Sequence, residues 1–356
     1  MNTNEVVANR AKEILDSNVH PNDHVNMGQS SNDVFPTSIH IATAMELTNK
    51  LLPALEILKE SLAKKETEFA KIVKTGRTHL QDATPILLSQ EFSAYKAQID
   101  FGIERINDSM ERLLELPLGG TAVGTGLNTH PDFSKTAIEN INKETNLNFK
   151  EARNHFEAQA SKDALVEMSG QLKVVAISFS KIANDIRWLA SGPRCGIGEI
   201  SIPEVQPGSS IMPGKVNPVI AESVLMVCAQ VIGNDQTVAI GGYGGSSFQL
   251  NVMMPVIAHN IIESISILST ASVNFAEKCV DGIQPNVKRL NDLAEASIAT
   301  ITSLAPIIGY DKSAEFAKEA FKTGMPVRDI VKKHKVLSDE EVDKALDLIS
   351  MTKPST

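Results

Sequence analysis

Aromatic residues are scarce in this chain of 356 residues, where they make up 4% and include a single tryptophan, Trp188. The interior must therefore be filled mainly by Ala, Leu, Ile, Val and Met, of which Ala, Leu and Met are among the best helix formers. Cysteine is also rare, and Cys195, Cys228 and Cys279 show no CxxC spacing, so neither a disulfide framework nor a zinc site is indicated. Cys228 and Cys279 lie in apolar stretches, where a cysteine usually behaves as a small hydrophobe. A reducing compartment fits this usage.

Positive charge is not clustered anywhere in the chain, whose formal net charge is −9. This argues against nucleic acid as a partner, because a phosphate backbone needs a clustered positive face. No run of about 18 uncharged apolar residues suggests a membrane span, and residues 1–16 mix charge and polarity unlike a signal peptide. We expect a cytoplasmic protein with no membrane partner.

Most of the sequence has the periodicity of helices. Apolar residues recur at three- and four-residue steps from Pro36 to about Val73, and Pro53 is expected to kink or interrupt this run. Further helical patterns cover residues 86–116, 157–190, 218–240, 249–280 and 285–307. Several exceed the usual helix length of about 8–20 residues, and no strand pattern of comparable strength appears. The sequence predicts an all-α fold with a long central helix bundle, buried partly against other subunits.

The pattern changes past Gly309. Residues 310–356 have shorter helical runs, many lysines and a break at residues 324–326. We therefore predict a central bundle domain over residues 1–309 and a small C-terminal helical domain over residues 310–356.

Three polar loops separate the long helices, at residues 28–36, 75–85 and 207–218. Each ends in a proline where a helical pattern begins, which is the favoured first-turn position. Asn217 is a natural N-cap for the helix after the third loop. Helix N-termini supply N–H donors and the positive end of the helix dipole, so the three loops suit a small carboxylate ligand.

Residues 207–218 carry the strongest functional signal. Ser209 and Ser210 lie between glycines that permit close approach of the backbone, and Lys215 adds a compact positive charge. A helix-capping loop would need only the final Asn-Pro. A P-loop is excluded, because five rather than four residues separate the glycines and a valine follows the lysine.

Other polar segments are open to two interpretations. His79 is either a surface or capping histidine or an acid–base group. Residues 30–33 form either a simple helix start or part of a ligand site. The glycine-rich stretches 119–126 and 241–247 match no dinucleotide fingerprint, and we interpret them as turns where helices or substrate approach the backbone closely. No cofactor is indicated.

Residues 208–218 resemble the signature of the fumarase/aspartase superfamily, whose members eliminate a group from a fumarate-yielding or related succinyl substrate. Two details resemble class II fumarases rather than aspartases. Ser31 stands where aspartases typically have threonine, and His79 stands where they carry glutamine. Residues 192–199 also look like fumarase, and the resemblance runs from Asn4 to about Lys322.

The resemblance implies a homotetramer with active sites shared between three subunits, which eliminates water reversibly from L-malate with no metal or organic cofactor. Ser209 is then the base that removes the C3 proton, with its alkoxide stabilised by loop N–H groups and by Lys215. His79, oriented by Glu222, handles the departing hydroxyl. The implied substrate-binding residues are Ser30, Ser31, Asn32, Thr78, Ser210, Lys215 and Asn217.

Two parts of the family pattern are altered here. The family's secondary dicarboxylate site is matched by His20, Pro21, Asn22 and Asp23. Ser17 and Asn18 stand where a basic residue usually lies just upstream, so we expect weak or missing binding at that site. The family also has a substantial N-terminal domain that ends in a Gly-Ser-Gly-Thr segment contacting substrate and water. This sequence begins after that segment, with a remnant of the domain at about residues 1–30, so those contacts are expected to be missing or supplied by another chain.

The sequence thus predicts a fumarate hydratase that acts on malate and fumarate. One alternative is an aspartate ammonia-lyase of the same superfamily, against which His79 argues. Another is a catalytically impaired fragment or helical scaffold, which the retained Ser209 and Lys215 oppose. Iron–sulfur hydratase chemistry is disfavoured, because the three cysteines are widely separated.

Overall fold

The protein is all-α in a computed structural model that describes residues 1–354. Within these residues, fourteen α-helices account for most of the ordered structure, which confirms the predicted fold class. The chain divides into two compact units. Unit 1 comprises Met1–Leu55, Phe101–Phe179 and Met226–Ser272, and unit 2 comprises Glu56–Asp100, Ser180–Leu225 and Val273–Thr356.

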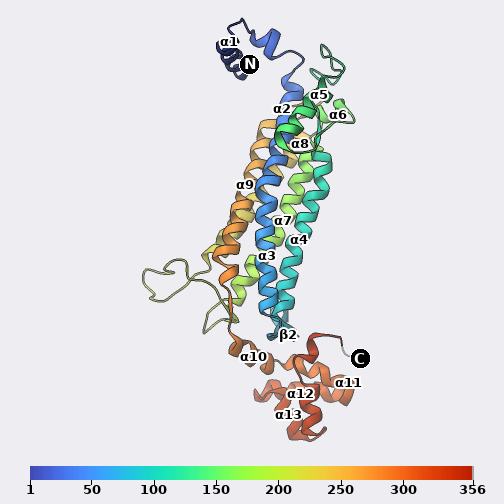
Figure 1. The fold of residues 1–356 in the computed structure, drawn as a ribbon. Helices are drawn as coiled ribbons and strands as arrows, with labels where there is room; N and C mark the ends of the chain where they lie inside the picture. Colours follow the sequence, from blue (N-terminus) through green and yellow to red (C-terminus); the bar gives the residue numbers. More distant parts are fainter. Residues whose placement is uncertain (355–356) are drawn as a thin grey trace. The chain divides into compact units, whose positions relative to one another are not determined.

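The elements follow one another along the ribbon of Figure 1. The α-helices are α1 (Asn2–Leu15), α2 (Ser31–Glu46), α3 (Leu52–Glu68), α4 (Leu88–Leu113), α5 (Phe133–Thr145), α6 (His155–Ala160), α7 (Asp163–Leu189), α8 (Val219–Gly244), α9 (Met254–Lys278), α10 (Val287–Ala296), α11 (Ala305–Ile308), α12 (Tyr310–Thr323), α13 (Val327–His334) and α14 (Asp339–Ala345). Shorter turns are η1 (Pro21–Val25) and η2 (Leu47–Leu51), both π-helical, and the 3-10 turns η3 (Val280–Gly282), η4 (Ile298–Leu304) and η5 (Ser350–Thr352).

Strands form small two-stranded pairs only, among the residues described. The longest pair is the antiparallel hairpin of β1 (Val73–Thr78) and β2 (Gln81–Leu87). The other pairs are β3 (Glu115–Leu116) with β4 (Lys150–Glu151), β5 (Ile200–Ser201) with β8 (Gln284–Pro285), and β6 (Ser246–Ser247) with β7 (Leu250–Asn251).

In unit 1, glycines allow α4, α7, α8 and α9 to approach one another closely. A Cβ on Gly102 of α4 would lie 3.0 Å from Val175 Cγ2 of α7. A Cβ on Gly241 of α8 would lie 2.8 Å from Ile257 Cγ1 of α9. Any larger residue at Gly241 would therefore push the two helices apart.

Polar side chains also join these helices inside unit 1. Ser169 Oγ donates to Asp235 Oδ1 at 2.8 Å, and Lys173 Nζ donates to Asp235 Oδ2 at 2.6 Å, which links α7 to α8. Asn234 Nδ2 donates to Glu263 Oε2 at 2.9 Å and so links α8 to α9. Because buried polar groups are tolerated only when they are paired, these bonds favour one rotation of each helix about its axis.

Unit 2 has an aromatic cluster at α3 and α4. Phe69 and Phe92 meet edge to face with ring centroids 5.1 Å apart, and Phe92 meets Tyr95 at 5.5 Å. The Tyr95 hydroxyl donates to Asp185 Oδ2 of α7 at 3.2 Å. Burial and the nearby charge of Glu91 raise the pKa of Tyr95 well above its ordinary value, so the hydroxyl keeps its proton and remains a donor.

The C-terminal helices of unit 2 have a hydrophobic core of their own. It is formed by Leu304, Phe316, Ala320, Val327, Ile330, Val331, Val342 and Leu346. These residues come from η4, α12, α13 and the end of α14. The predicted domain boundary at residues 309 and 310 remains a prediction, and residues 355–356 of that domain lie outside the described part of the chain.

The first long helical run differs from its prediction at both prolines. α2 begins at Ser31 rather than at Pro36, and Pro36 lies inside the helix. Before Pro53 the chain makes the π-helical turn η2, in which Leu52 N–H donates to Leu47 O. Proline lacks an N–H and clashes with a carbonyl of the preceding turn, and the wider π-helical turn takes up the interruption predicted there.

The second predicted loop is a β-hairpin that the periodicity did not reveal. Pro85 lies in β2 opposite Thr75, and α4 begins only at Leu88, so the expectation of a first-turn proline is wrong here. The strand pattern was hidden because Val73 is the one apolar side chain of β1, and two cations stand at positions that face the interior. Lys74 has 1% of its surface exposed, and Arg77 is half-buried.

Two helical stretches, α8 and residues Met254–Gly282, have the length and composition of a membrane span. Apolar core helices of globular proteins pass the same test. Both stretches carry buried residues that pack inside the protein, such as Val231 and Ile265.

His40 of α2 is buried in unit 1 and provides a pH-dependent contribution to stability. Its Nδ1 lies 2.8 Å from Leu113 O, and only 5% of the residue is exposed. Burial, aided by the charge of Lys162, lowers the pKa of His40 to about 4. Between pH 6.5 and 4 the unfolded chain therefore binds a proton at His40 that the folded chain does not, and the stability is lost as the pH falls.

We predict that acidification from pH 7.5 to pH 5.0 removes about 2 kcal/mol of unfolding free energy through this one group. In His40→Asn, the amide Nδ2 replaces the imidazole donor to Leu113 O without titrating, so that part of the pH dependence should vanish. Urea unfolding followed by circular dichroism at both pH values measures the difference. His130→Asn, at an exposed histidine, is the control and should leave the dependence unchanged; an equal effect of both variants would contradict the assignment.

Candidate active site

The hairpin β1–β2 presents His79 at its tip. Thr78 pairs with Gln81, so the turn consists of His79 and Leu80 alone. Both have positive φ values, 55° and 58°, in the left-handed region where glycine or asparagine is usual for such a turn. Each costs about 1–2 kcal/mol relative to an ordinary conformation. Backbone strain of this kind clusters at functional sites, and here it occurs at an exposed histidine that the sequence had left open.

The hairpin is bulged at Gly76. The register shifts between Thr75 and Arg77, and a Cβ on Gly76 would lie 2.6 Å from Thr84 O on the facing strand. Only glycine fits so close to a carbonyl. The bulge thus offsets the half of the hairpin that carries Thr78 and His79 from its base.

The serine loop, residues 207–218, is closed by its own backbone. Gly208 N–H donates to Lys215 O at 2.9 Å, and a Cβ on Gly208 would lie 2.2 Å from that oxygen. Inside the closed loop, Ser209 Oγ accepts from the N–H groups of Ile211 at 3.2 Å and Met212 at 3.1 Å. Two aligned N–H donors on one oxygen are the arrangement that stabilises an oxyanion.

Asn217 does not cap α8, which corrects the prediction. The helix begins at Val219, and the carbonyl of Pro218 accepts the first bond, from Glu222 N–H. Asn217 instead donates its Nδ2–H to Gly208 O at 2.7 Å and fastens the two ends of the serine loop. This bond, rather than helix capping, explains the asparagine at position 217.

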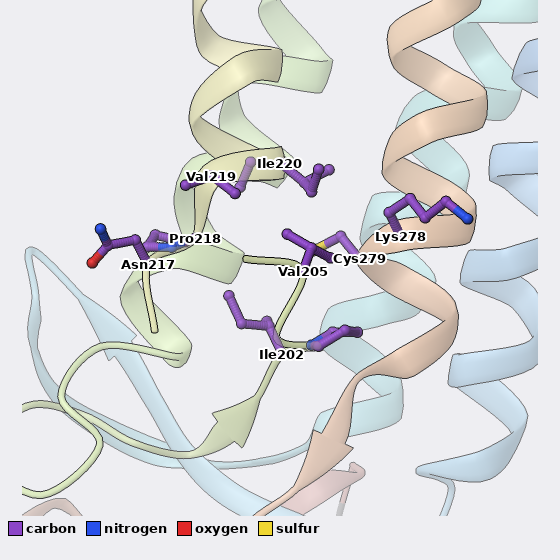
Figure 2. Close-up of a pocket in the computed structure, with 10 residues that line it drawn as sticks. Ile202, Val205, Asn217, Pro218, Val219, Ile220, Lys278 and Cys279 are labelled. Carbon is purple, nitrogen blue, oxygen red and sulfur yellow. The ribbon is translucent and has the colours of Figure 1, made fainter. Parts of the chain in front are cut away.

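The space beside the end of the serine loop is too small for a substrate. Asn217, Pro218, Val205 and Cys279 are among the side chains that surround it (Figure 2), and its volume is about 10 Å³. Such a cavity holds one water molecule at most.

The predicted catalytic groups of unit 2 are not joined by direct contacts in the single chain. Within residues 1–354, no hydrogen bond or ion pair connects His79 to Ser209 or to Glu222. The side chains of Ser210 and Lys215 are exposed, and Glu222 is half-buried in the first turn of α8. Their roles remain predictions.

The first loop in unit 1 is a helix start, as one of its two interpretations had it. Ser30 is the N-cap of α2, with its Oγ accepting from Asn32 N–H at 3.2 Å and its N–H donating to Asp33 Oδ1 at 3.1 Å. Ser31 is exposed at the first helical position. Asn32 Nδ2 donates to Ala122 O at 2.8 Å, so this loop also reaches the glycine-rich stretch 119–126.

Asp33 was missed by the sequence analysis. Its carboxylate has no exposed surface and accepts N–H bonds from Gly119 at 2.9 Å and Thr121 at 3.1 Å, in addition to Ser30. The stretch 119–126 was expected to be a turn at a close approach, and this is confirmed: a Cβ on Gly120 would lie 2.1 Å from Gln159 Oε1. The capping-box spacing of Ser30 and Asp33 was the one available signal, and it did not reveal the bonds from the glycine-rich turn.

The segment predicted as a secondary dicarboxylate site is the short turn η1. His20 Nδ1 accepts from the N–H groups of Asn22 at 3.3 Å and Asp23 at 3.2 Å. An Nδ1 that accepts these bonds carries no proton, so the 3.3 Å approach of Asp23 Oδ2 to it is not an ion pair in that state. Dicarboxylate binding there remains a prediction.

The sequence matches the lyase family over residues 1–233 and the fumarase C C-terminus over residues 301–353. It is 51% identical over 360 residues to a class II fumarate hydratase of Neisseria meningitidis, covering 99% of this chain and 78% of that protein. The chain belongs to the class II fumarase family. It is also 52% identical to a class II fumarate hydratase of Corynebacterium glutamicum, covering 99% of this chain and 75% of that protein.

Solved structures agree with this family. A class II fumarase from Schistosoma mansoni superposes with a TM-score of 0.96 at 38% identity, covering 100% of this chain and 78% of that one. A fumarate lyase:delta crystallin from Brucella melitensis superposes with a TM-score of 0.95 at 45% identity, covering 99% of this chain and 78% of that one.

The cysteines behave as predicted for this fumarase-family chain. Cys228 and Cys279 are buried, and burial raises the pKa of each thiol to about 12. Cys195 is exposed. Among residues 1–354, no group of three His, Cys, Asp or Glu side chains is arranged to hold a metal ion.

We predict that Asp33→Asn lowers the free energy of unfolding by about 3 kcal/mol, because an amide accepts on one side only and leaves at least one buried N–H unpaired. Urea unfolding at pH 7.5 measures the loss. Asp163→Asn, at an exposed aspartate in the first turn of α7, is the matched control and should change stability by less than about 0.5 kcal/mol. Equal effects of the two substitutions would show that the bonds to Gly119 and Thr121 contribute little.

Proposed function

We propose that the chain catalyses the reversible anti elimination of water from L-malate to give fumarate. The observation that carries the proposal is the serine loop, in which two backbone N–H groups converge on Ser209 Oγ. The relatives named fumarate hydratases, about half identical over nearly the whole chain, support the same reaction.

Proton removal is the difficult first step, because the C3 proton of malate is only weakly acidic. In this proposal Ser209 reacts as an alkoxide, stabilised by the N–H groups of Ile211 and Met212 and by the charge of Lys215. Its Oγ takes the C3 proton, and the electron pair of the C–H bond moves into the adjacent carboxylate. The product of this step is an aci-carboxylate intermediate.

Lys215 and Asn217 hold the carboxylate on which this negative charge accumulates. One N–H of Asn217 Nδ2 bonds to Gly208 O, which leaves its second N–H for a substrate oxygen. The bond to Gly208 also fixes the direction of the amide. Asn217 thus links the shape of the serine loop to the position of the intermediate.

The C2–O bond breaks in the second step. His79, oriented by Glu222, donates a proton to the departing hydroxyl directly or through a water, and the electron pair of the broken bond leaves with the oxygen as water. The electron pair held in the aci-carboxylate returns at the same time to form the C2–C3 double bond of fumarate. His79 lies exposed at the tip of the hairpin, which suits a group that must contact a substrate bound outside the hairpin. The substrate is bound by Ser30, Ser31, Asn32, Thr78 and Ser210.

The Ser30 hydroxyl serves this role beside its structural one, since its oxygen accepts the capping bond from Asn32 and its proton is left to donate. The reaction as proposed uses no metal or organic cofactor. At the secondary site, His20, Pro21, Asn22 and Asp23 would bind a dicarboxylate weakly, because the two backbone N–H groups of η1 are already bonded to His20.

We also propose that the protein is a homotetramer with active sites shared between subunits. Apolar side chains remain exposed on α8, at Met226, Ile232, Ile240 and Tyr243, and a second copy of the chain would cover them. Sharing is further supported by the absence of contacts between His79 and Ser209 within residues 1–354. The relatives include bacterial enzymes and two named mitochondrial, from Rhizopus oryzae and Dictyostelium discoideum, so the cytoplasmic location stays a prediction.

We predict that Ser209→Ala lowers kcat for fumarate formation by about 1,000-fold, since it removes the base and leaves the fold intact. Ultraviolet absorbance of fumarate, with L-malate as substrate, measures the rate. Ser201→Ala, at an exposed serine of β5, is the control and should retain full activity. Release of ammonia from L-aspartate would favour the ammonia-lyase instead, and no turnover of either substrate by folded protein would favour the scaffold.

Mixing two inactive variants tests the shared site. Tetramers reassembled from Ser209→Ala and His79→Asn chains should regain roughly a quarter of wild-type activity, because an active site then needs intact Ser209 from one chain and intact His79 from another. Each variant reassembled alone is the control and should remain inactive. Mixed tetramers of confirmed composition without activity would place both residues of each site on one chain.

A further inference from the structure

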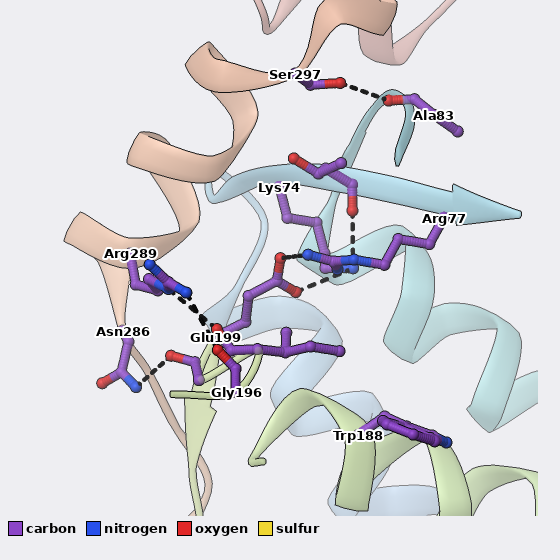
Figure 3. A network of polar contacts seen from close by, with 12 residues as sticks. Lys74, Arg77, Ala83, Trp188, Gly196, Glu199, Asn286, Arg289 and Ser297 are labelled. Carbon is purple, nitrogen blue, oxygen red and sulfur yellow. Dashed lines mark hydrogen bonds and ion pairs between the residues drawn. The ribbon is translucent and has the colours of Figure 1, made fainter. Parts of the chain in front are cut away.

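Glu199 ends the segment 192–199, which takes no part in the proposed mechanism. Its carboxylate has no exposed surface and faces two cations of β1 (Figure 3). Arg77 Nη2 donates to Oε1 at 2.7 Å, and Lys74 Nζ lies 3.3 Å from Oε2. A charge so fully removed from water is stable only while such partners remain, so the carboxylate and the strand are held together.

Arg77 carries this interaction to the tip of the hairpin, because it lies in β1 only two residues before His79 in the turn. Burial by itself disfavours the charged guanidinium, but the hydrogen bond and the charge of Glu199 raise the pKa of Arg77 above its ordinary value. Its planar fork directs the N–H bond toward one carboxylate oxygen, which fixes direction as well as distance.

The backbone of Glu199 is held just as firmly. Its N–H donates to Leu189 O at 2.9 Å, and its carbonyl accepts from Asn286 N–H at 2.8 Å. Arg289 donates to the carbonyls of Ile197 and Gly196, each at 3.1 Å (Figure 3). The Glu199 side chain, which binds the hairpin, therefore extends from a backbone segment held by several hydrogen bonds. The same segment continues into the serine loop.

We propose that Glu199 is a positioning residue for both catalytic loops. Through Arg77 its carboxylate holds the hairpin that presents His79, and through its backbone it anchors the segment that leads to Ser209. It acts on the reaction only through these neighbours. This inference rests on the proposed hydratase function for its effect on rate, but its effect on the hairpin does not depend on that function.

The test is Glu199→Gln in the full chain. Glutamine keeps the size and can accept from Arg77, but its amide N–H then faces the Lys74 ammonium, and two donors meet. We expect kcat to fall by about 10- to 100-fold while KM rises by less than about ten-fold, since the change misplaces His79 and, of the proposed substrate-binding residues, only Thr78 beside it. Hydrogen–deuterium exchange of the backbone amides of residues 73–87 should become faster than in the wild type.

Glu91→Gln is the matched control. Glu91 contacts Lys74 at 3.1 Å in the same cluster but does not bond to Arg77. It should leave the exchange of residues 73–87 and kcat within about two-fold of the wild type. If the two variants changed both quantities equally, general loss of the ion cluster would be the cause and the proposal would be wrong.

Three further outcomes decide whether the proposal holds. The proposal would be overturned if Glu199→Gln left the exchange of the hairpin unchanged and kcat within three-fold of the wild type. It would also be overturned if exchange rose uniformly over unit 2 while kcat per folded protein stayed unchanged. Faster hairpin exchange in a protein whose wild type does not act on malate would support the hold on the hairpin and count against the proposed function alone. Should Glu199→Gln fail to fold, Arg77→Lys is judged by the same two measurements, because it keeps the charge and loses the fork.

Discussion

A carboxylate without exposed surface must be surrounded by cations or N–H donors, and in each unit the segments proposed to be functional are arranged around such a group. In unit 2 the group is Glu199, whose partners are the side chains of Arg77 and Lys74. In unit 1 it is Asp33, whose partners are three backbone N–H groups. The loss of any partner would leave a buried charge or donor unpaired, at a cost of about 1–3 kcal/mol or more. Segments far apart in sequence are thereby fixed to each other where substrate chemistry is proposed.

Backbone groups supply most of the local precision at these sites. The N–H pair on Ser209 exists because Gly208 allows the loop to close on Lys215 O, and the turn at Gly119–Thr121 exists because its N–H groups bond to Asp33. Donors fixed in this way need no reorganisation when negative charge appears. The exposed side chain of Lys215, which the proposed reaction uses, extends from this frame.

The fold class and the family could be predicted from the sequence, but several local structures could not. The long helices could be recognised by the period of their apolar residues, and the serine loop by its unusual composition. The β1–β2 hairpin was missed because buried Lys74 and half-buried Arg77 broke the strand pattern, and both cations pair with Glu199 more than a hundred residues away. Asp33 was missed for the same reason, since its partners Gly119 and Thr121 are remote in sequence. The cap expected at Asn217 failed because its side chain had a better partner in Gly208.

The left-handed turn at His79 and Leu80 lowers the stability of the fold through backbone strain, and at position 79 the strained residue is the proposed acid–base group. A chain optimised only for thermal endurance would carry Asn-Gly at this tip and would gain about the strain that the present pair stores. At position 80 that exchange gives up only an exposed leucine, whereas at position 79 it gives up the imidazole. To stabilise this protein, position 80 of the turn can be changed without loss of the imidazole. Position 79 cannot, and its strain measures the stability that the fold gives up by having a histidine there.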